Sequence, residues 1–471
     1  QERNRVLASM LSVLWMVGNK YPMFIASQRL ESRMSNELWG KWQQFIRSVD
    51  TSLDVIRALM VFLMIRGLGK VKTFRDAAAS SSATSRTTRS APSPENAIMW
   101  LLERGVWCVP SLEKLDGEML QLVKATFRVY SRFNLAQMMQ GENTPAQIVA
   151  LLTAIIDEGQ NAQVQPSRLL KFYLLALVSF MCGLRGDDTL EGSLFLDDEN
   201  GRNLFSCISS LQQLESASPQ AIYWSYIAGR ANHLNIPNVQ PEDFALARLA
   251  CLTRATSTTK EMLVSAWSEL HPHYRTVLTD HFLADGIHEG AIIFEFLPAF
   301  FANCKNNPVV GLNAALALLV ELVEIASRDI TREPSTLLVR INLSDIAFFS
   351  ERVRNANVFE ALSSHLKVEY EEHGEKGNDN ANLVIASKHW HYVDYEVWED
   401  EPMQQIRRIL HRMERSMGRK IEGIATAVGP HVQEENAVDD SGKTLPDVAQ
   451  SHGRQSNMAA KSRPLILPPS G

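Results

Sequence analysis

Histidine and carboxylate side chains gather in one short stretch of the chain, residues 271–289. The candidate metal ligands in this stretch are His271, His273, His281, Asp285 and His288. Imidazole and carboxylate are common ligands of zinc, iron and manganese, so three of these groups could share one ion. On a helix that begins near residue 274, His281 and Asp285 are four residues apart and lie on one face. Solvated helix ends give the same composition without a metal, and that alternative stays open.

A second candidate site combines aromatic and basic side chains near residue 400. The aromatic residues are Trp390, Tyr392, Tyr395 and Trp398, and the basic residues are Arg407, Arg408, Arg412 and Arg415. An aromatic sheet face followed by a basic helix is typical of proteins that stack and hold unpaired bases. The alternative is an ordinary solvated face of an amphipathic helix at residues 402–417.

Motifs of common enzyme classes are incomplete in this sequence. Gly69-Lys70 resembles the end of a phosphate-binding loop, but Met64 replaces its first glycine and Val71 its Ser or Thr. His288-Glu289 begins a zinc-protease motif that lacks the second histidine. Neither a nucleophile elbow nor a dinucleotide-binding glycine motif is present. The sequence therefore predicts no cofactor and favours a non-enzymatic protein.

One segment has a family resemblance. Tyr223-Trp224-Ser225-Tyr226-Ile227-Ala228-Gly229 is similar to the Trp-Ser-Tyr-Ala-Met-Gly segment of nucleoproteins from non-segmented negative-strand viruses. The resemblance covers seven residues, of which Ile227 and Ala228 depart from the pattern. It implies two helical lobes with a disordered tail that wrap single-stranded RNA. Without the resemblance, the same residues are one apolar turn of a core helix.

Composition describes an ordinary globular chain with no strong preference for a partner. The 471 residues carry 47 Lys and Arg against 53 Asp and Glu, for a formal charge of −6. A nucleic-acid site would therefore have to be a local basic patch. The cysteines are dispersed and form no C-x-x-C motif: Cys108, Cys182, Cys207, Cys251 and Cys304. We expect buried thiols in a reducing, cytoplasmic compartment. No apolar run reaches the roughly 18 residues of a membrane span, so none is predicted.

Proline marks the starts of helices between residues 94 and 327. Its missing N–H has no partner in the first helical turn, so proline is favoured there. The predicted starts are Pro94, Pro145, Pro166, Pro219 and Pro241. The segment from Thr144 to Pro166 is echoed 74 residues later, from Ser218 to Pro241. A stacked helical array with a solenoid-like repeat would explain this echo, and so would convergent use of the same helix caps. No strand is predicted in this span.

Periodicity changes after residue 332. Alternating apolar residues predict strands at 337–343, 366–371, 383–388 and 392–398, in a small antiparallel sheet with helices at 344–361 and 402–417. The predicted fold is mainly α, a stacked helical array followed by a small C-terminal α+β module and a disordered tail. The predicted divisions are an N-terminal helical segment (1–75), a flexible linker (76–93), the helical body (94–330), the module (336–418) and the tail (419–471).

These patterns favour an interaction or scaffold protein that presents a helical groove, with another protein as its partner. The alternative is a protein that binds single-stranded nucleic acid through the basic C-terminal helix or as a nucleoprotein. A metal-dependent enzyme that uses residues 271–289 is the third hypothesis.

Overall fold

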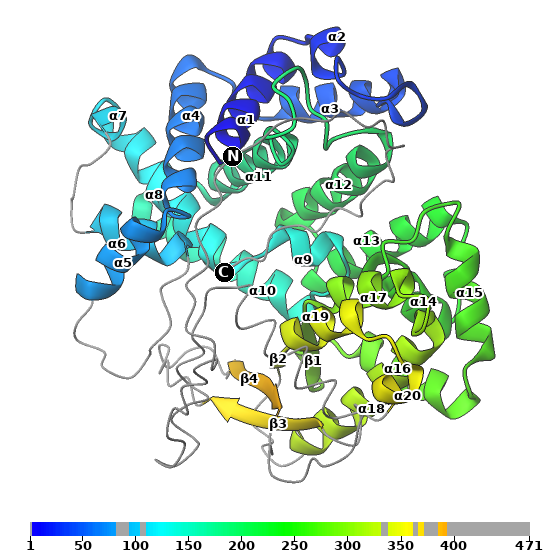
Figure 1. Cartoon of the computed structure of the whole chain (residues 1–471). Helices are drawn as coiled ribbons and strands as arrows, with labels where there is room; N and C mark the ends of the chain where they lie inside the picture. Colours follow the sequence, from blue (N-terminus) through cyan, green and yellow to red (C-terminus); the bar gives the residue numbers. More distant parts are fainter. Residues whose placement is uncertain are drawn as a thin grey trace, which may run out of the picture. The chain divides into compact units, whose positions relative to one another are not determined.

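A computed structural model of the chain describes residues 2–81, 94–103, 110–330, 338–360, 366–371 and 385–392. These residues are mainly helical, as the sequence predicts, with a small sheet close to the C-terminal end of the described part (Figure 1). No helix among them combines the length and the apolar character that crossing a bilayer requires. The predicted helix at 402–417 and the predicted tail lie outside the described residues.

The N-terminal part of the chain forms one group of helices. They are α1 (Glu2–Val17), α2 (Tyr21–Phe24), the 3-10 helix η1 (Leu30–Ser32), α3 (Asn36–Ser48), α4 (Leu53–Leu68) and α5 (Lys72–Ser81). Residues 76–81, placed by the sequence in a linker, are the last turns of α5, where three consecutive alanines favour helix. The remainder of the predicted linker, 82–93, is outside the described residues.

The central part continues as helices up to residue 283. They are α6 (Pro94–Glu103), α7 (Pro110–Glu113), α8 (Gly117–Arg132), α9 (Leu135–Met139), α10 (Pro145–Ala162), α11 (Pro166–Cys182), α12 (Asp198–Leu211), η2 (Gln212–Glu215), α13 (Pro219–Leu234), α14 (Pro241–Leu252), α15 (Lys260–Glu269) and α16 (Pro272–Leu283). The five proline starts predicted from the sequence are all confirmed. At the start of α10 the Gln147 side chain accepts from the backbone N–H of Thr144 at 3.1 Å.

The echoed segments form two similar helix pairs, α10–α11 and α13–α14. The first helix of each pair ends at a left-handed residue, Gln163 or Asn235. The next residue, Val164 or Ile236, donates its backbone N–H back into the helix and is buried. Helix α10 packs against α11 and α13, and α13 packs against α14, so the two pairs form a stacked array. Gly229 lies inside α13.

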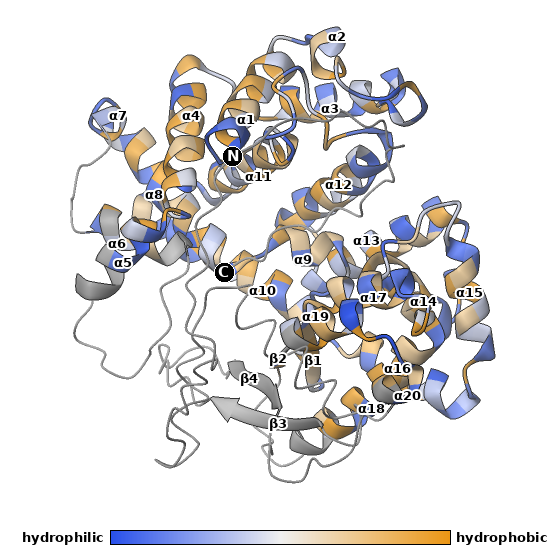
Figure 2. Cartoon of the chain, viewed as in Figure 1, coloured by the Kyte–Doolittle hydropathy of each residue, from blue (hydrophilic) through white to orange (hydrophobic). Residues whose placement is uncertain are grey.

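Helix α1 lies against α11 and α4 (Figure 1), and two glycines permit the close approach to α11. A Cβ atom on Gly183 would be 2.1 Å from the Ser9 hydroxyl oxygen, and one on Gly186 would be 2.5 Å from the Cβ of Ala8. The guanidinium of Arg5 donates to both carboxylate oxygens of Asp187, at 3.0 and 3.2 Å. These helices are rich in hydrophobic residues (Figure 2).

Replacing Gly183 with alanine is therefore expected to lower the free energy of unfolding by roughly 2 kcal/mol, because the added methyl group forces α1 away from α11. Gly40 is the matched control: it lies inside α3, and a Cβ there would meet nothing within 4 Å. Gly40→Ala should raise the free energy of unfolding by about 0.5–1 kcal/mol. Urea denaturation of both variants measures the difference, and equal effects would contradict the close contact.

A four-stranded sheet follows the central helices. The remaining elements are β1 (Ala291–Glu295), α17 (Leu297–Asn306), α18 (Gly311–Ile330), β2 (Leu338–Asn342), α19 (Ser344–Arg352), α20 (Ala356–Glu360), β3 (Leu366–Glu371) and β4 (Ile385–Tyr392). The strand order is β1-β2-β4-β3. Strands β1, β2 and β4 are parallel, and β3 is antiparallel to β4. In this register Glu295, Asn342 and His389 lie side by side.

The sheet corrects two expectations. Strand β1 lies where the sequence predicts no strand, because its first four residues are all buried and show no polar alternation. The predicted antiparallel pairing is wrong for β2 and β4, which are parallel and therefore need a long connection that the local pattern does not reveal. The predicted helix 344–361 is divided into α19 and α20. Of the predicted strand 392–398, only Tyr392 is described, as the last residue of β4.

Candidate anion-binding cleft

A cavity of about 400 Å³ opens between α3, α12 and α13, and we call it the cationic cleft. Its lining residues are Leu38, Lys41, Arg202, Asn203, Phe205, Ser206, Ser209, Ser210, Gln213, Ser225, Gly229, Arg230 and His233. Three of them are permanent cations, several are hydroxyl or amide side chains, and none is an Asp or Glu. Such a lining suits a negatively charged ligand that accepts hydrogen bonds.

The Arg230 guanidinium is the unusual group in the cationic cleft. The residue is only 4% exposed, yet its Nε and Nη1 atoms have no hydrogen-bond partner. The thiol of Cys251 accepts a hydrogen bond from the guanidinium, but burial raises the pKa of that thiol, so it stays neutral. Glu199 attracts Arg230 without forming an ion pair with it. Buried N–H groups are almost always paired, so these two require an explanation.

The other cations of the cleft already have partners. Arg202 donates from Nε to Asp198 at 2.7 Å, and the ammonium of Lys41 lies 2.7 Å from the Glu37 carboxylate. Burial and the neighbouring positive charges of Arg230 and Arg202 lower the pKa of His233, which keeps its imidazole neutral near pH 7. Arg230 is thus the one permanent cation of the cleft lining without an ion-pair partner.

Helix periodicity brings the lining residues together. Ser225, Gly229 and His233 are spaced by four residues and lie on one face of α13. Gly229 lets this face approach α12 closely, since a Cβ there would be 3.0 Å from the Ser206 hydroxyl oxygen. The cleft is not predicted from the sequence, although this four-residue spacing of small and polar side chains was a signal. The buried face of the same helix carries Tyr226, whose hydroxyl donates to the Met139 carbonyl at 2.7 Å.

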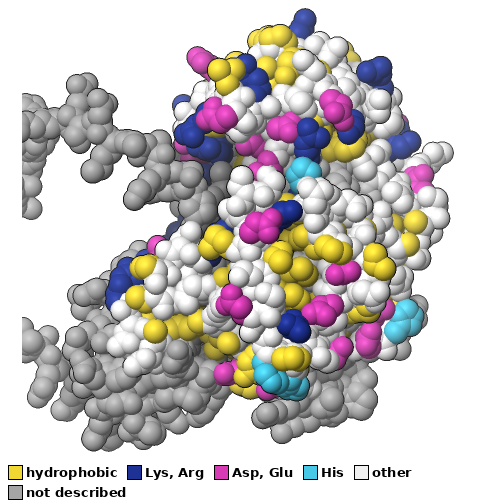
Figure 3. Space-filling model, turned by 90° about the vertical axis from the view of Figure 1, so that its right-hand side faces the viewer, with side chains coloured by type: hydrophobic (Ala, Val, Ile, Leu, Met, Phe, Trp, Pro, Cys, Tyr) yellow, Lys and Arg dark blue, Asp and Glu magenta, His cyan; other side chains and the backbone are white. Residues whose placement is uncertain are grey.

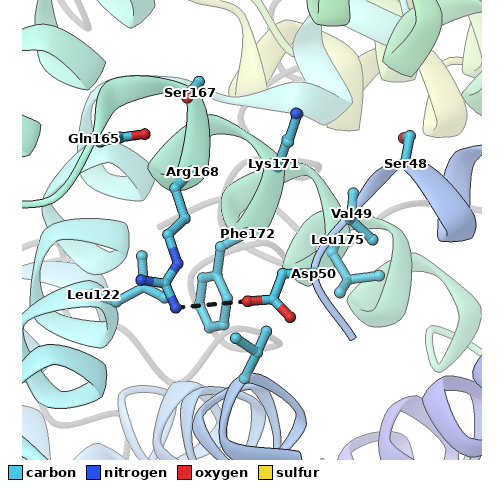
Figure 4. Close-up of a pocket in the computed structure, with 11 residues that line it drawn as sticks. Ser48, Val49, Asp50, Leu122, Gln165, Ser167, Arg168, Lys171, Phe172 and Leu175 are labelled. Carbon is cyan, nitrogen blue, oxygen red and sulfur yellow. Dashed lines mark ion pairs between the residues drawn. The ribbon is translucent and has the colours of Figure 1, made fainter. Parts of the chain in front are cut away.

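A second cavity, of about 250 Å³, provides a contrast (Figure 4). It lies between the segment joining α3 to α4 and the helices α8 and α11. Its Arg168 points toward Asp50, with an ion-pair distance of 3.5 Å, and also pairs with Glu118. Lys171 points away from this pair in Figure 4. The arginine of this cavity is therefore already neutralised by carboxylates of the chain itself.

Charged and apolar side chains are interspersed on the face of the molecule shown in Figure 3. Lys and Arg alternate there with Asp and Glu, and no broad cationic surface is visible. This mixture agrees with the acidic total charge of the chain.

The candidate metal ligands are dispersed over several small local structures. His271 caps the start of α16, where its Nδ1 accepts from the backbone N–H of His273 at 3.3 Å. The His273 imidazole lies 3.4 Å from Glu324 of α18. Asp285 accepts from the backbone N–H of Ile287 and is 2.7 Å from the His288 Nδ1. Within the described residues, no three His, Cys, Asp or Glu side chains form a group able to hold a metal ion.

His281 is the buried member of this set. Its ring packs against Phe282 and Phe294, with centroid distances of 4.8 and 5.4 Å. Burial, assisted by the charge of Arg248, lowers the pKa of His281 to about 3. The structure therefore makes it a neutral core side chain, separate from the pair of Asp285 and His288.

The C-terminal candidates are only partly described. Trp390 and Tyr392 lie in β4, which pairs with β2 along one edge and with β3 along the other. The remaining aromatic and basic candidates lie outside the described residues: Tyr395, Trp398, Arg407, Arg408, Arg412 and Arg415. Nucleic-acid binding through this region stays a prediction.

The comparisons with known proteins give one match. Residues 1–170 match the model of a family of unknown function (DUF6829). No curated protein and no solved structure matches the chain. The match spans 170 of 471 residues and includes Lys41 on the α3 side of the cationic cleft. Arg202 and Arg230, which form the opposite side, follow the matched region.

Proposed function

We propose that this chain is a non-enzymatic interaction protein that receives an anionic side chain of a protein partner in the cationic cleft. The observation that carries the proposal is Arg230, a residue of the cleft lining whose buried guanidinium has no ion-pair partner and has two partnerless N–H groups. Desolvating a charge without full hydrogen bonding destabilises the folded protein. An anionic ligand in the cleft would supply the missing countercharge.

The distribution of charge favours a protein partner over a nucleic acid. A single strand is held by a groove in which cations follow several phosphates. Here Lys41 and Arg202 are already paired with Glu37 and Asp198 at the edge of the cleft. A cavity with one uncompensated arginine suits one anionic group, such as a side chain presented by a folded or extended protein. The helical array supplies the rigid elements that hold the cavity open.

Replacing Arg230 with methionine tests the proposal through stability and binding together. We expect the free energy of unfolding to stay unchanged or to rise by about 1 kcal/mol, because methionine fills similar space without a buried charge. The same substitution should remove binding of acidic peptides to the immobilised full-length chain. A displayed peptide library, compared with one in which amides replace Asp and Glu, measures that binding.

Arg168→Met is the matched control, because Arg168 also lines a cavity but has carboxylate partners. This variant should retain the wild-type preference for acidic peptides. If Arg230→Met loses several kcal/mol of stability and still binds the same acidic peptides, Arg230 has a purely structural role and the proposal fails.

A further inference from the structure

We infer that the outer face of α1 and α4 is a docking surface for an amphipathic helix of a protein partner, and that the polar side of this helix is acidic. We call the surface the α1–α4 face. It consists of Leu7, Met10, Leu14 and Val17 of α1 with Met60 and Met64 of α4. It shares no residue with the cationic cleft, so the inference goes beyond the proposed function.

Exposed hydrophobic side chains are concentrated in the N-terminal helices. Thirteen large hydrophobic side chains are exposed among the described residues, and eight of them lie within residues 1–75. Leu14 is 53% exposed and Leu7 is 40% exposed. A single exposed hydrophobic residue is ordinary, but a contiguous group of them marks an interaction surface. The arrangement of α1 and α4 brings several of these side chains into such a group.

Helix α1 is oriented with its polar side inward. Ser9 and Ser12 are buried, and their hydroxyls donate to carbonyls of the same helix at 2.9 and 2.7 Å. Leu7, Leu14 and Val17 are exposed instead. A helix on the surface of a globular protein normally buries its large hydrophobic residues and exposes its hydroxyls. A partner that covers the outer side of α1 explains the inverted orientation.

Helix α4 continues the hydrophobic surface of α1. Gly67 of α4 lies beside Val6 of α1, because a Cβ atom added to this glycine would be 2.8 Å from the Val6 Cγ2 atom. Met10 follows Val6 by four residues, and Met64 and Met60 precede Gly67 by three and seven. Residues at these spacings share one side of a helix, so the three methionines border the seam between α1 and α4. Methionine is common at surfaces that adapt to a bound helix.

The composition of α4 also indicates a covered surface. Apart from three charged residues, this helix consists of hydrophobic residues and one glycine. A helix that is hydrophobic on all sides is normally buried on all sides. Hydrophobic residues predominate in both α1 and α4 (Figure 2), yet Met64 and the outer side chains of α1 remain exposed.

The spacing of residues along α1 fits a helix as the partner. Leu7, Met10, Leu14 and Val17 alternate in steps of three and four residues, which is the seven-residue pattern of helices that pack side by side. The sixteen residues of α1 span about 24 Å, so they match a partner helix of about four turns. Binding to a lipid bilayer would require side chains that reach about 5–10 Å into it, whereas those of the α1–α4 face are partly buried among their neighbours.

Positive charge surrounds the α1–α4 face. Residues 1–75 contain twelve Lys and Arg but five Asp and Glu, for a formal charge of +7 in a chain whose total is −6. Arg3 and Lys20 lie at the two ends of α1, and Lys72 follows α4; all three are exposed and form no ion pair with the described residues. Glu2, the one acidic residue of α1, is already paired with a lysine at 2.7 Å. A second copy of the chain would bring like charges together, whereas an acidic partner helix complements them.

The test measures retention of three peptide libraries on the immobilised full-length chain. Each peptide has about 18 residues, with Leu, Ile, Met or Phe varied at the hydrophobic positions of a seven-residue helical repeat. The other positions are Ala and Glu in the first library and Ala and Lys in the second. The third library is the first with Ser at the hydrophobic positions. We expect the Glu library to be retained at least about tenfold better than either of the others.

Two variants and a matched control locate the binding. Leu14→Glu should abolish retention of the Glu library, because it places a carboxylate within the hydrophobic face at an exposed position that tolerates substitution. Met262→Glu should retain the library as the wild type does, since Met262 is 54% exposed in α15, outside this face. Arg3→Gln, Lys20→Gln and Lys72→Gln together should reduce the preference for the Glu library over the Lys library severalfold. Circular dichroism of each variant confirms that it is folded.

The contrary outcomes are distinct from one another. No retention of the Glu library, or retention that Leu14→Glu leaves unchanged, would overturn the inference. Equal retention of the Glu and Lys libraries would also overturn it, because the partner would not be acidic. Arg230→Met should retain the Glu library, and loss in this variant alone would assign the helix to the cationic cleft instead.

Two further measurements exclude the other occupants of the face. Analytical ultracentrifugation of the full-length chain should show no dimer that Leu14→Glu abolishes. Sedimentation with vesicles of phosphatidylcholine and phosphatidylserine should likewise show no binding that depends on Leu14. A positive result in either measurement would overturn the inference, because a second copy or a lipid bilayer would then be the occupant.

Discussion

Replacing Arg248 with methionine is expected to lower the free energy of unfolding by roughly 3 kcal/mol, because it leaves buried carbonyl groups without a donor. Arg248 is 2% exposed and donates from Nε to the Gly141 carbonyl at 2.8 Å and from Nη1 to the Phe282 carbonyl at 2.7 Å. Its Nη2 donates to the Asn143 carbonyl at 3.0 Å. The side chain thus joins α14 to the loop before α10 and to the end of α16.

The contrast with Arg230 makes this prediction specific. Both arginines are buried, but Arg248 has carbonyl partners while two nitrogens of Arg230 have none. Urea denaturation should therefore show a large loss for Arg248→Met and no loss for Arg230→Met. Equal losses in the two variants would mean that the carbonyl contacts of Arg248 do not support the fold.

Replacing Glu142 with glutamine is expected to change how stability depends on pH. Burial, and after it the nearby Glu295 carboxylate, raise the pKa of Glu142 to about 8, against the opposing effects of Arg254 and the backbone N–H groups of Phe296 and Leu297. The folded protein therefore binds this proton more tightly than the unfolded chain, whose carboxyl titrates near 4.5. From about pH 4.5 to 8, Glu142 lowers the free energy of unfolding by up to about 1.4 kcal/mol per pH unit.

His281 affects the pH dependence of the free energy of unfolding with the opposite sign. Its folded-state pKa of about 3 lies below the ordinary value of 6.5, so the unfolded chain binds the proton more tightly. The free energy of unfolding then rises with pH between about 3 and 6.5, at the same maximal slope. In the wild type, the two contributions cancel between about pH 4.5 and 6.5, and only the loss from Glu142 remains from 6.5 to 8.

Glu142→Gln should expose the His281 contribution. The free energy of unfolding of the variant is expected to rise steadily from about pH 4.5 to 6.5. Above pH 6.5 it should no longer fall as it does in the wild type. Glutamine keeps an oxygen that can accept from the backbone N–H groups at the start of α17. Urea denaturation at a series of pH values measures both slopes, with Glu31→Gln as the exposed control. An unchanged profile in Glu142→Gln would show that Glu142 is not a buried carboxyl with a raised pKa.

Helix starts could be predicted because their signals are local. Proline at the first position of a helix acts within one turn of the backbone, as at Pro145 and Pro166. The predicted starts at Pro94, Pro219 and Pro241 are confirmed for the same reason. Likewise, the mainly helical class follows from the periodicity of apolar residues over each segment.

The sheet and the candidate site depended on contacts between distant parts of the chain. Strand β1 has no alternating pattern because both of its faces are buried. Its first residue, Ala291, pairs with Leu338 of β2, which is 47 residues later in the sequence. The cationic cleft combines Lys41 with Arg230, and the partners of Arg248 are as many as 107 residues away. The sequence shows which residues are charged, but not which charges find partners.

By itself, the sequence determined the helical class, the starts of the central helices and the absence of several complete catalytic motifs. Only the tertiary structure shows that the Arg248 guanidinium has hydrogen-bond partners while two nitrogens of Arg230 have none. It also shows that Asp285 pairs with His288, apart from the other histidines of the set. This difference follows from the distance along the sequence over which each interaction acts. Caps and periodicity act over a few residues, whereas burial, hydrogen-bond satisfaction and local potential are set by elements that meet only after folding.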